Sequence, residues 1–223
     1  MEKKYIVLSK FNNNLDILAS KKLKFILIIL FFLPFSVANS NNSKTETLKN
    51  EEIAKFVKKM HQDHQISETW LNLNIKNYVK QKKAIRLISP KNKKRKKLKK
   101  NWYVYRKNFV TPKNINSGRK FLLNNKLALK KASITFGVPV YVIAGIIGVE
   151  TRFGKIKGNF PVFDTLVSLS FDQDHRKDFF KKELKELLLL AKENNIDISK
   201  VNSSFAGAMG IPQFMPSSWR SYA

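Results

Sequence analysis

Hydrophobic residues recur at helical spacing along most of the chain. In residues 51–64, apolar positions repeat every three or four residues, which predicts an amphipathic helix. Ser67 is expected to cap a second, less regular helix. The clearest pattern covers residues 174–194, which predict a helix with one apolar face. The apolar positions of these segments are Ile53, Phe56, Val57 and Met60, and then Phe180, Leu184, Leu187, Leu188 and Ala191.

The segment from residue 101 to residue 171 predicts further helices. Residues 117–136 are expected to form one helix that Gly137 ends, and Pro139 is expected in the first turn of the next helix. Asp164 is a candidate cap for residues 165–171. Only residues 101–110, NWYVYRKNFV, alternate well enough to suggest a strand. The chain is therefore predicted to be mainly α-helical.

Residues 138–150, VPVYVIAGIIGVE, combine an apolar helix with one terminal acid, Glu150. With so little polar surface the helix is predicted to be buried, and burial would raise the pKa of the Glu150 carboxyl, as suits a general acid. Gly145 and Gly148 each cost a helix about 1 kcal/mol relative to alanine, which indicates that a chain or ligand comes close. A structural alternative stays open, in which Glu150 pairs with Arg152 or caps a loop amide.

Composition adds a strong positive charge. The chain has 43 Lys and Arg against 16 Asp and Glu, a net charge of +27, which favours an anionic partner or reflects compositional bias. The basic run Lys91–Lys100 lacks interleaved aromatic residues, so we interpret it as a solvated surface segment and not as a nucleic-acid site. The absence of cysteine excludes disulfides, thiolate metal sites and a cysteine nucleophile.

The N-terminus predicts export. Three lysines precede the apolar run Phe25–Phe35, and the small residues that end at Ala38 suit a signal peptidase. We therefore predict a signal peptide over residues 1–38, a flexible linker over 39–50 and a domain over 51–223. The protein is expected in the periplasm, with membrane association if the segment is retained, and this location argues against nucleic acid as a partner.

Three motifs carry a resemblance to a known family. They are GIIGVETRFG (145–154), TLVSLSF (165–171) and SSFAGAMGIPQFMPSSW (203–219). In this order and spacing the sequence resembles the membrane-bound lytic murein transglycosylase B family, over about residues 101–223 and more weakly from about residue 50. The resemblance implies a lysozyme-like catalytic domain that cleaves peptidoglycan.

The resemblance also implies roles for single residues. Glu150 matches the catalytic acid/base, which protonates the oxygen between N-acetylmuramic acid and N-acetylglucosamine and then helps the muramyl 6-hydroxyl close on C1 as a 1,6-anhydro ring. Ser204 matches a serine that orients this glutamate, Gln213 a glutamine of the sugar cleft, and Arg176 an arginine that meets the peptide stems. His175 stands where a second arginine is usual. Residue type alone leaves competing interpretations open. Ser204 could cap a turn, and Gln213 and Arg176 could be solvated surface side chains.

Two further expectations follow from the resemblance. Asp164 and Asp172, the other nearby acids, are interpreted as structural. Family members continue past the position of Ala223 through a calcium-binding loop and more helices, so a truncated chain is expected, without metal or cofactor. Two function classes result: a monomeric lytic transglycosylase acting on peptidoglycan strands, or a murein-binding remnant without turnover.

Overall fold

The computed structural model describes residues 40–90 and 101–223, with side chains from Thr45 onward. The predicted signal peptide and the basic run Lys91–Lys100 lie outside these residues. The chain divides into two units, Met1–Asn42 and Ser43–Ala223, and the features below belong to the second unit, except that helix α1 begins at Ser40.

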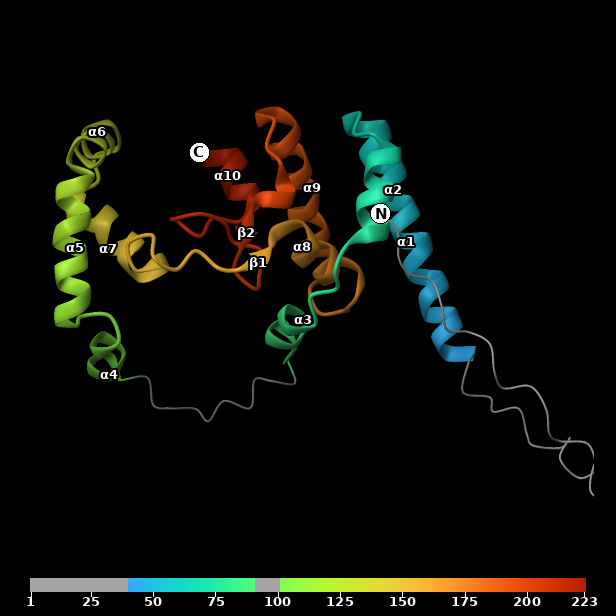
Figure 1. The fold of residues 1–223 in the computed structure, drawn as a ribbon, viewed down its shortest axis with the longest axis horizontal. Coiled ribbons are helices and arrows are strands. Elements are labelled where there is room, and N and C mark those ends of the chain that lie inside the picture. Colours follow the sequence, from blue (N-terminus) through green and yellow to red (C-terminus); the bar gives the residue numbers. More distant parts are fainter. Residues whose placement is uncertain (1–39, 91–100) are drawn as a thin grey trace, which may run out of the picture. The chain divides into compact units, whose positions relative to one another are not determined.

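The described part of the chain is mainly helical, as predicted (Figure 1). Its α-helices are α1 (Ser40–His64), α2 (Glu68–Asn77), α3 (Lys82–Ile88), α4 (Trp102–Lys107), α5 (Pro112–Asn124), α6 (Lys126–Phe136), α7 (Val140–Thr151), α8 (Val162–Phe171), α9 (Lys177–Asn194) and α10 (Pro216–Tyr222). A short 3₁₀ helix, η3, covers Ile198–Lys200. Two short strands, β1 (Phe160–Pro161) and β2 (Asn202–Ser203), pair antiparallel with Phe160 opposite Ser203.

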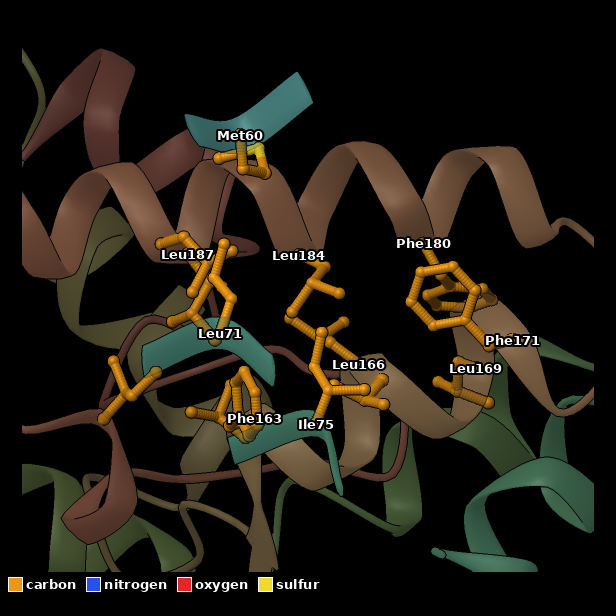
Figure 2. Packing of buried hydrophobic residues seen from close by; sticks show 14 of the residues in the cluster. Met60, Leu71, Ile75, Phe163, Leu166, Leu169, Phe171, Phe180, Leu184 and Leu187 are labelled. Carbon is orange, nitrogen blue, oxygen red and sulfur yellow. The ribbon is translucent and has the colours of Figure 1, made fainter. Parts of the chain in front are cut away.

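The core forms around α8 and α9. Figure 2 shows Leu184 and Leu187 of α9 facing residues of α8, with Met60 of α1 and Leu71 of α2 packed against the same layer. Except for Asp164, every residue of α8 is buried, because neighbours cover this short apolar helix on all sides. The amphipathic patterns of residues 51–64 and 174–194 are thereby confirmed as core-facing helices.

Polar contacts fix α1 to the same core. The Lys49 ammonium lies 2.8 Å from the Asp172 carboxylate, which also accepts a hydrogen bond of 2.5 Å from the Tyr78 hydroxyl. Glu52 forms ion pairs with Lys177 and Lys181 of α9 at 3.0 and 2.9 Å. Residues far apart in the sequence are thus joined around the end of α8, and Asp172 has the structural role that we predicted.

Helices α5, α6 and α7 pack against one another. The Phe153 ring, which follows α7, fills the space beside Gly118 of α5 and Gly148 of α7. A Cβ atom added at Gly118 would lie 2.9 Å from the tip of this ring, and one added at Gly148 would lie 2.7 Å from it. The close approach that Gly148 predicted is therefore made by the chain's own phenylalanine, whereas an added Cβ at Gly145 would meet no described atom within 4 Å.

The predicted burial of residues 138–150 is wrong. In α7 only Ala144 and Thr151 are buried, and Tyr141 and Ile146 are 73% and 55% exposed. The pattern identified the helix but not its surroundings, because α5 and α6 cover only part of its surface among the described residues. No single described helix has the length and apolar character to cross a membrane. Only α6 and α7 taken together are long and apolar enough, and a bend of 114° separates them.

Four local predictions also fail. Residues 40–50 are helical as part of α1, so the predicted flexible linker is wrong there. Residues 102–107 form α4 and not a strand, because the Asn101 side chain caps the segment by accepting from the backbone N–H of Tyr103. The helix predicted over 117–136 is divided at Asn125 into α5 and α6. Asp164 lies within the first turn of α8 and is not its N-cap, which is Pro161.

Two helix-end predictions are confirmed. Gly137 follows α6 with a φ of 68°, the left-handed conformation that glycine adopts most easily. The Ser67 side chain accepts a hydrogen bond of 3.2 Å from the backbone N–H of Trp70 at the start of α2. The prediction that Pro139 lies in the first turn of α7 is wrong by one position, because Pro139 precedes the helix and is its N-cap residue.

Candidate active site

Glu150 lies in the last turn of α7, just before the chain changes direction. Arg152 and Phe153 have φ values of 49° and 62°, and Gly154 has a φ of 82°, so three successive residues are left-handed. The backbone N–H of Arg152 still donates to the carbonyl of Gly148 at 3.1 Å. This arrangement ends the helix directly after the glutamate and leads the chain into residues 155–159.

The Glu150 side chain is exposed, so the desolvated carboxyl that we predicted is not found. Within the described residues it makes no hydrogen bond or ion pair, and Arg152 does not pair with it. The structural alternative therefore finds no support in this part of the chain. A carboxylate without a partner at the end of a rigid helix is free to meet a polymer approaching from solvent.

Thr151, next to Glu150, fastens the end of α7 to a distant loop. Its side chain is fully buried, at 0% exposure. The hydroxyl lies 3.0 Å from the carbonyl oxygen of Ile211 and 3.2 Å from that of Ile147, and it accepts a hydrogen bond of 2.9 Å from the backbone N–H of Gly154. One hydroxyl thus connects the helix, its turn and the loop over residues 203–215. Sequence reasoning missed this residue, because Thr151 stands between two charged residues, Glu150 and Arg152, and so gives no sign of burial.

The segment after α7 packs closely on the same loop. Gly158 has a φ of 91°, and a Cβ atom there would lie 2.1 Å from the carbonyl oxygen of Ser203. Only glycine allows these two backbones to approach so closely. The Ser203 hydroxyl donates to the carbonyl of Phe160 at 3.1 Å or that of Ser204 at 3.0 Å, beside the β1–β2 pairing.

Gln213 joins the two segments through its side chain. Its amide nitrogen donates to the carbonyl of Gly210 at 2.9 Å and to that of Lys157 at 3.2 Å. Its backbone is left-handed, with a φ of 53°. The structure therefore gives Gln213 a part in the loop that receives the Thr151 hydrogen bond, and its amide oxygen accepts no hydrogen bond among the described residues.

Ser204 organises its own loop. Its hydroxyl oxygen accepts from the backbone N–H groups of Ala206 and Ala208 at 3.3 and 3.1 Å, while its backbone N–H donates to the carbonyl of Ala208 at 2.8 Å. This is the turn-capping behaviour of the competing interpretation. No hydrogen bond joins Ser204 to Glu150 within residues 101–223. The hydroxyl hydrogen has no acceptor there, so the predicted orienting role stays a prediction.

Arg176 lies outside this set of contacts. It precedes α9 with a φ of 61°, and its guanidinium carbon lies 4.2 Å from the centre of the Phe179 ring, a cation–π contact. No hydrogen bond or ion pair links it to residues 150–159 in the described ranges. Gln213 and the neighbours of Ser204 thus contact the segment that follows Glu150, whereas Arg176 forms its contacts with Phe179 and Phe180.

The charges around Glu150 are positive. Arg152, Lys155 and Lys157 are exposed within the eight residues that follow it. Lys155 donates to the Ser117 hydroxyl of α5 at 2.9 Å. The described residues contain no group of three or more His, Asp or Glu side chains placed to hold a metal ion. The residues available for chemistry are therefore one carboxyl group and three exposed cationic residues that follow it closely in the sequence.

Comparison with known proteins places this arrangement in a family. Residues 49–223 match the family described as the Transglycosylase SLT domain. The membrane-bound lytic murein transglycosylase B of Escherichia coli (strain K12) is 45% identical over 122 residues, which are 55% of this chain and 34% of that protein.

Solved structures agree with this match. The soluble lytic transglycosylase SltB1 from Pseudomonas aeruginosa has a TM-score of 0.72 and 39% identity, over 77% of this chain and 57% of that one. The Escherichia coli lytic transglycosylase Slt35 in complex with bulgecin A has a TM-score of 0.70 and 36% identity, over 77% of this chain and 54% of that one. The chain thus spans about half the length of these structures and a third of the curated relative.

Proposed function

Since the chain belongs to the transglycosylase SLT domain family, we propose that it acts in lytic cleavage of peptidoglycan, with Glu150 as its acid and base. The proposed bond is the β-1,4 bond between N-acetylmuramic acid and N-acetylglucosamine. The name of the curated relative supports a murein substrate, and the match over residues 49–223 includes Glu150, Ser204 and Gln213.

The proposed reaction needs only one carboxyl group. Glu150 gives its proton to the glycosidic oxygen as the bond from that oxygen to C1 of the muramic acid breaks. The resulting carboxylate takes the proton of the muramyl 6-hydroxyl, whose oxygen bonds to C1. The proton count balances and no water enters, so a second carboxylate of the kind that ordinary glycosidases use is not required.

The observation that carries this proposal is the unpartnered state of Glu150. A structural carboxylate at a helix end would pair with Arg152 or a loop amide, and neither contact is formed among the described residues. Thr151 meanwhile fixes the backbone beside it to the loop that contains Ser204 and Gln213. A fixed backbone with a free carboxyl is what positioning against a bound glycan requires.

The surrounding cations give substrate attraction a physical basis. Arg152, Lys155 and Lys157 follow Glu150, and peptide stems of murein carry carboxylates. Arg176 contributes a further exposed guanidinium at the start of α9. We place this activity in the periplasm, where such a substrate lies, and we retain the monomer as the working state.

The test incubates the protein with purified sacculi and analyses the soluble products by mass spectrometry. Muropeptides with 1,6-anhydro ends are the expected result. Products with reducing ends would contradict the intramolecular transfer and indicate hydrolysis by water. Sedimentation with sacculi without any soluble product would favour the second function class, a murein-binding protein without turnover.

A further inference from the structure

A pocket whose lining does not include Glu150 lies between α2, the start of α8 and the end of α9. Its volume is about 720 Å³, within the range of about 300–1,000 Å³ usual for small-ligand sites. Phe163, Leu188 and Ile198 supply an apolar lining and belong to the buried core. The pocket is thus a rigid part of the fold.

One face of α2 lines this pocket with an aromatic ring and two amides. Trp70, Asn74 and Asn77 are spaced by four and three residues, so they share a helix face, while Leu71 and Ile75 face the core. The Trp70 ring meets Phe163 edge to face, with ring centres 6.1 Å apart, and stays 40% exposed. An exposed indole held by a buried ring is a preformed platform for an apolar surface.

The polar groups around this platform are available for a ligand. The Asn74 amide nitrogen donates to the carbonyl of Trp70 at 2.7 Å, which leaves its oxygen as an acceptor. Among residues 45–90 and 101–223, no partner is found for the indole N–H of Trp70 or for the side-chain amide of Asn77. Free donors and acceptors beside an aromatic ring match a ligand that has both hydroxyl or amide groups and an apolar face.

The charges of the pocket give an anionic ligand little attraction, despite the chain's net charge of +27. Asp164 lines the pocket, and its partial burial raises the pKa of its carboxyl while the backbone N–H of Val79 opposes the shift. The cation nearby, Lys192, is engaged by the carbonyls of His64 and Gln65 at 2.8 and 3.4 Å. Asp197 is paired with Lys200 at 3.0 Å. A phosphate or nucleic acid would therefore meet the Asp164 carboxylate and would compete with two backbone carbonyls for the Lys192 ammonium group.

We propose that this pocket is a second saccharide site, which binds N-acetylated sugar units of a glycan through Trp70, Asn74 and Asn77. The C–H face of a pyranose ring packs on the indole, and the Asn77 amide donates to an acetamido carbonyl. Asp164 accepts from sugar hydroxyls. The choice of an N-acetylated sugar rests on the proposed function. The assignment of the aromatic platform and its amides as a binding site does not depend on that function.

The test uses the three tryptophans of the chain, which give separate indole N–H signals in a nitrogen-15 NMR spectrum. The full chain is titrated with the β-1,4-linked tetramer of N-acetylglucosamine, and Trp70→Phe assigns the Trp70 signal. We expect the Trp70 signal to shift with saturation while the Trp102 signal stays in place. An unmoved Trp70 signal at millimolar tetramer would overturn the proposal.

Matched variants separate this site from the catalytic one. Asn77→Ala is expected to weaken the Trp70-reported affinity at least about fivefold, whereas Glu150→Gln is expected to leave it unchanged, so a failure of catalysis cannot imitate a failure of this site. Asn194→Ala, an exposed asparagine of α9 outside this pocket, is the control for amide loss.

Cellotetraose, which lacks acetamido groups, is expected to shift the Trp70 signal less. An equal shift would overturn the assignment to N-acetylated sugars.

Discussion

At the scale of single residues, Thr151 explains how an exposed glutamate can be held in position. Its buried hydroxyl contacts the Ile211 carbonyl and accepts from the Gly154 backbone, so the end of α7 cannot move independently of the loop. Glu150 itself needs no contact to be positioned, because its backbone is fixed by its neighbour. This arrangement keeps the carboxyl free for chemistry.

Replacing Thr151 by valine keeps the volume and removes the hydroxyl. The backbone carbonyl of Ile211 and the backbone N–H of Gly154 lose a partner beside this buried side chain, and we expect the free energy of unfolding to fall by about 2 kcal/mol. Urea denaturation measures this loss. Thr151→Ser, which keeps the hydroxyl, is the control and should lose only about 1 kcal/mol. Serine as damaging as valine would show that the methyl group matters and the hydrogen bonds do not.

A positioning role predicts a second effect of the same pair of variants. Under conditions in which both proteins are fully folded, Thr151→Val should release anhydro products more slowly than Thr151→Ser at saturating sacculi. A purely structural role would leave the two folded proteins equally active. Product release quantified by mass spectrometry distinguishes these outcomes.

At the scale of elements, α7 shows what a sequence pattern can predict about a helix and what it cannot. The apolar run predicted a helix ending at Glu150, and the helix is there. Its burial could not be predicted, because a pattern records which side chains are apolar and not which elements cover them. The division at Asn125 and the helical conformation of residues 102–107 were also not predicted, because apolar spacing does not record where a helix breaks or that the Asn101 side chain caps α4.

The candidate site residues could be proposed from the sequence, and their roles stay predictions, but the connections between their segments could not be predicted. Glu150, Ser204 and Gln213 came from motif resemblance, and the structure links their segments through Thr151, Gly158 and Gln213 itself. Those links involve backbone carbonyls and a left-handed glycine, which leave little trace in residue type. Residues that act through the backbone are therefore the ones that sequence reasoning missed.

The two glycines inside α7 provide a paired test of element packing. At Gly145 an added methyl group meets no described atom, so Gly145→Ala should stabilise the protein by about 0.5–1 kcal/mol through helix propensity. At Gly148 it would lie 2.7 Å from the Phe153 ring, so Gly148→Ala should destabilise by about 1–3 kcal/mol. Thermal unfolding of both variants measures the difference. Equal effects would contradict the packing of Phe153 against α7.

At the scale of the whole molecule, the cluster of Lys49, Tyr78 and Asp172 joins α1 to the end of α8. The Asp172 side chain is 2% exposed. Burial alone would raise the pKa of its carboxyl, but hydrogen bonds from Lys49 and Tyr78 together lower the pKa below its usual range. Burial, with the hydrogen bond to Asp172, raises the pKa of Tyr78 to about 12.

These shifts predict how stability depends on pH. Because the folded pKa of Asp172 is depressed, its contribution is present above the unfolded value of about 3.9 and is lost as pH falls through the folded pKa. Because the folded pKa of Tyr78 is raised, its contribution is present below about pH 10 and is lost as pH rises toward about 12. Urea titrations across both ranges should show stability falling at each end.

Asp172→Asn isolates the acidic part of this dependence. At pH 7 the variant should lose about 3 kcal/mol of unfolding free energy, because Lys49 and Tyr78 lose a charged, buried partner. The difference from the unsubstituted protein should shrink below about pH 4. Asp178→Asn, whose carboxylate is 90% exposed, is the control and should change stability by less than about 0.5 kcal/mol. A difference that stayed constant down to the lowest pH would contradict the assignment.

The central claim is that Glu150 moves the proton in glycan cleavage, and the most direct measurement is the rate of anhydro-muropeptide release from sacculi by Glu150→Gln. The control is Glu51→Gln, an exposed glutamate of α1. At equal sacculus binding, we expect Glu150→Gln to be at least about 100-fold slower than the unsubstituted protein and Glu51→Gln to be unchanged. Release by Glu150→Gln at the unsubstituted rate would contradict the account.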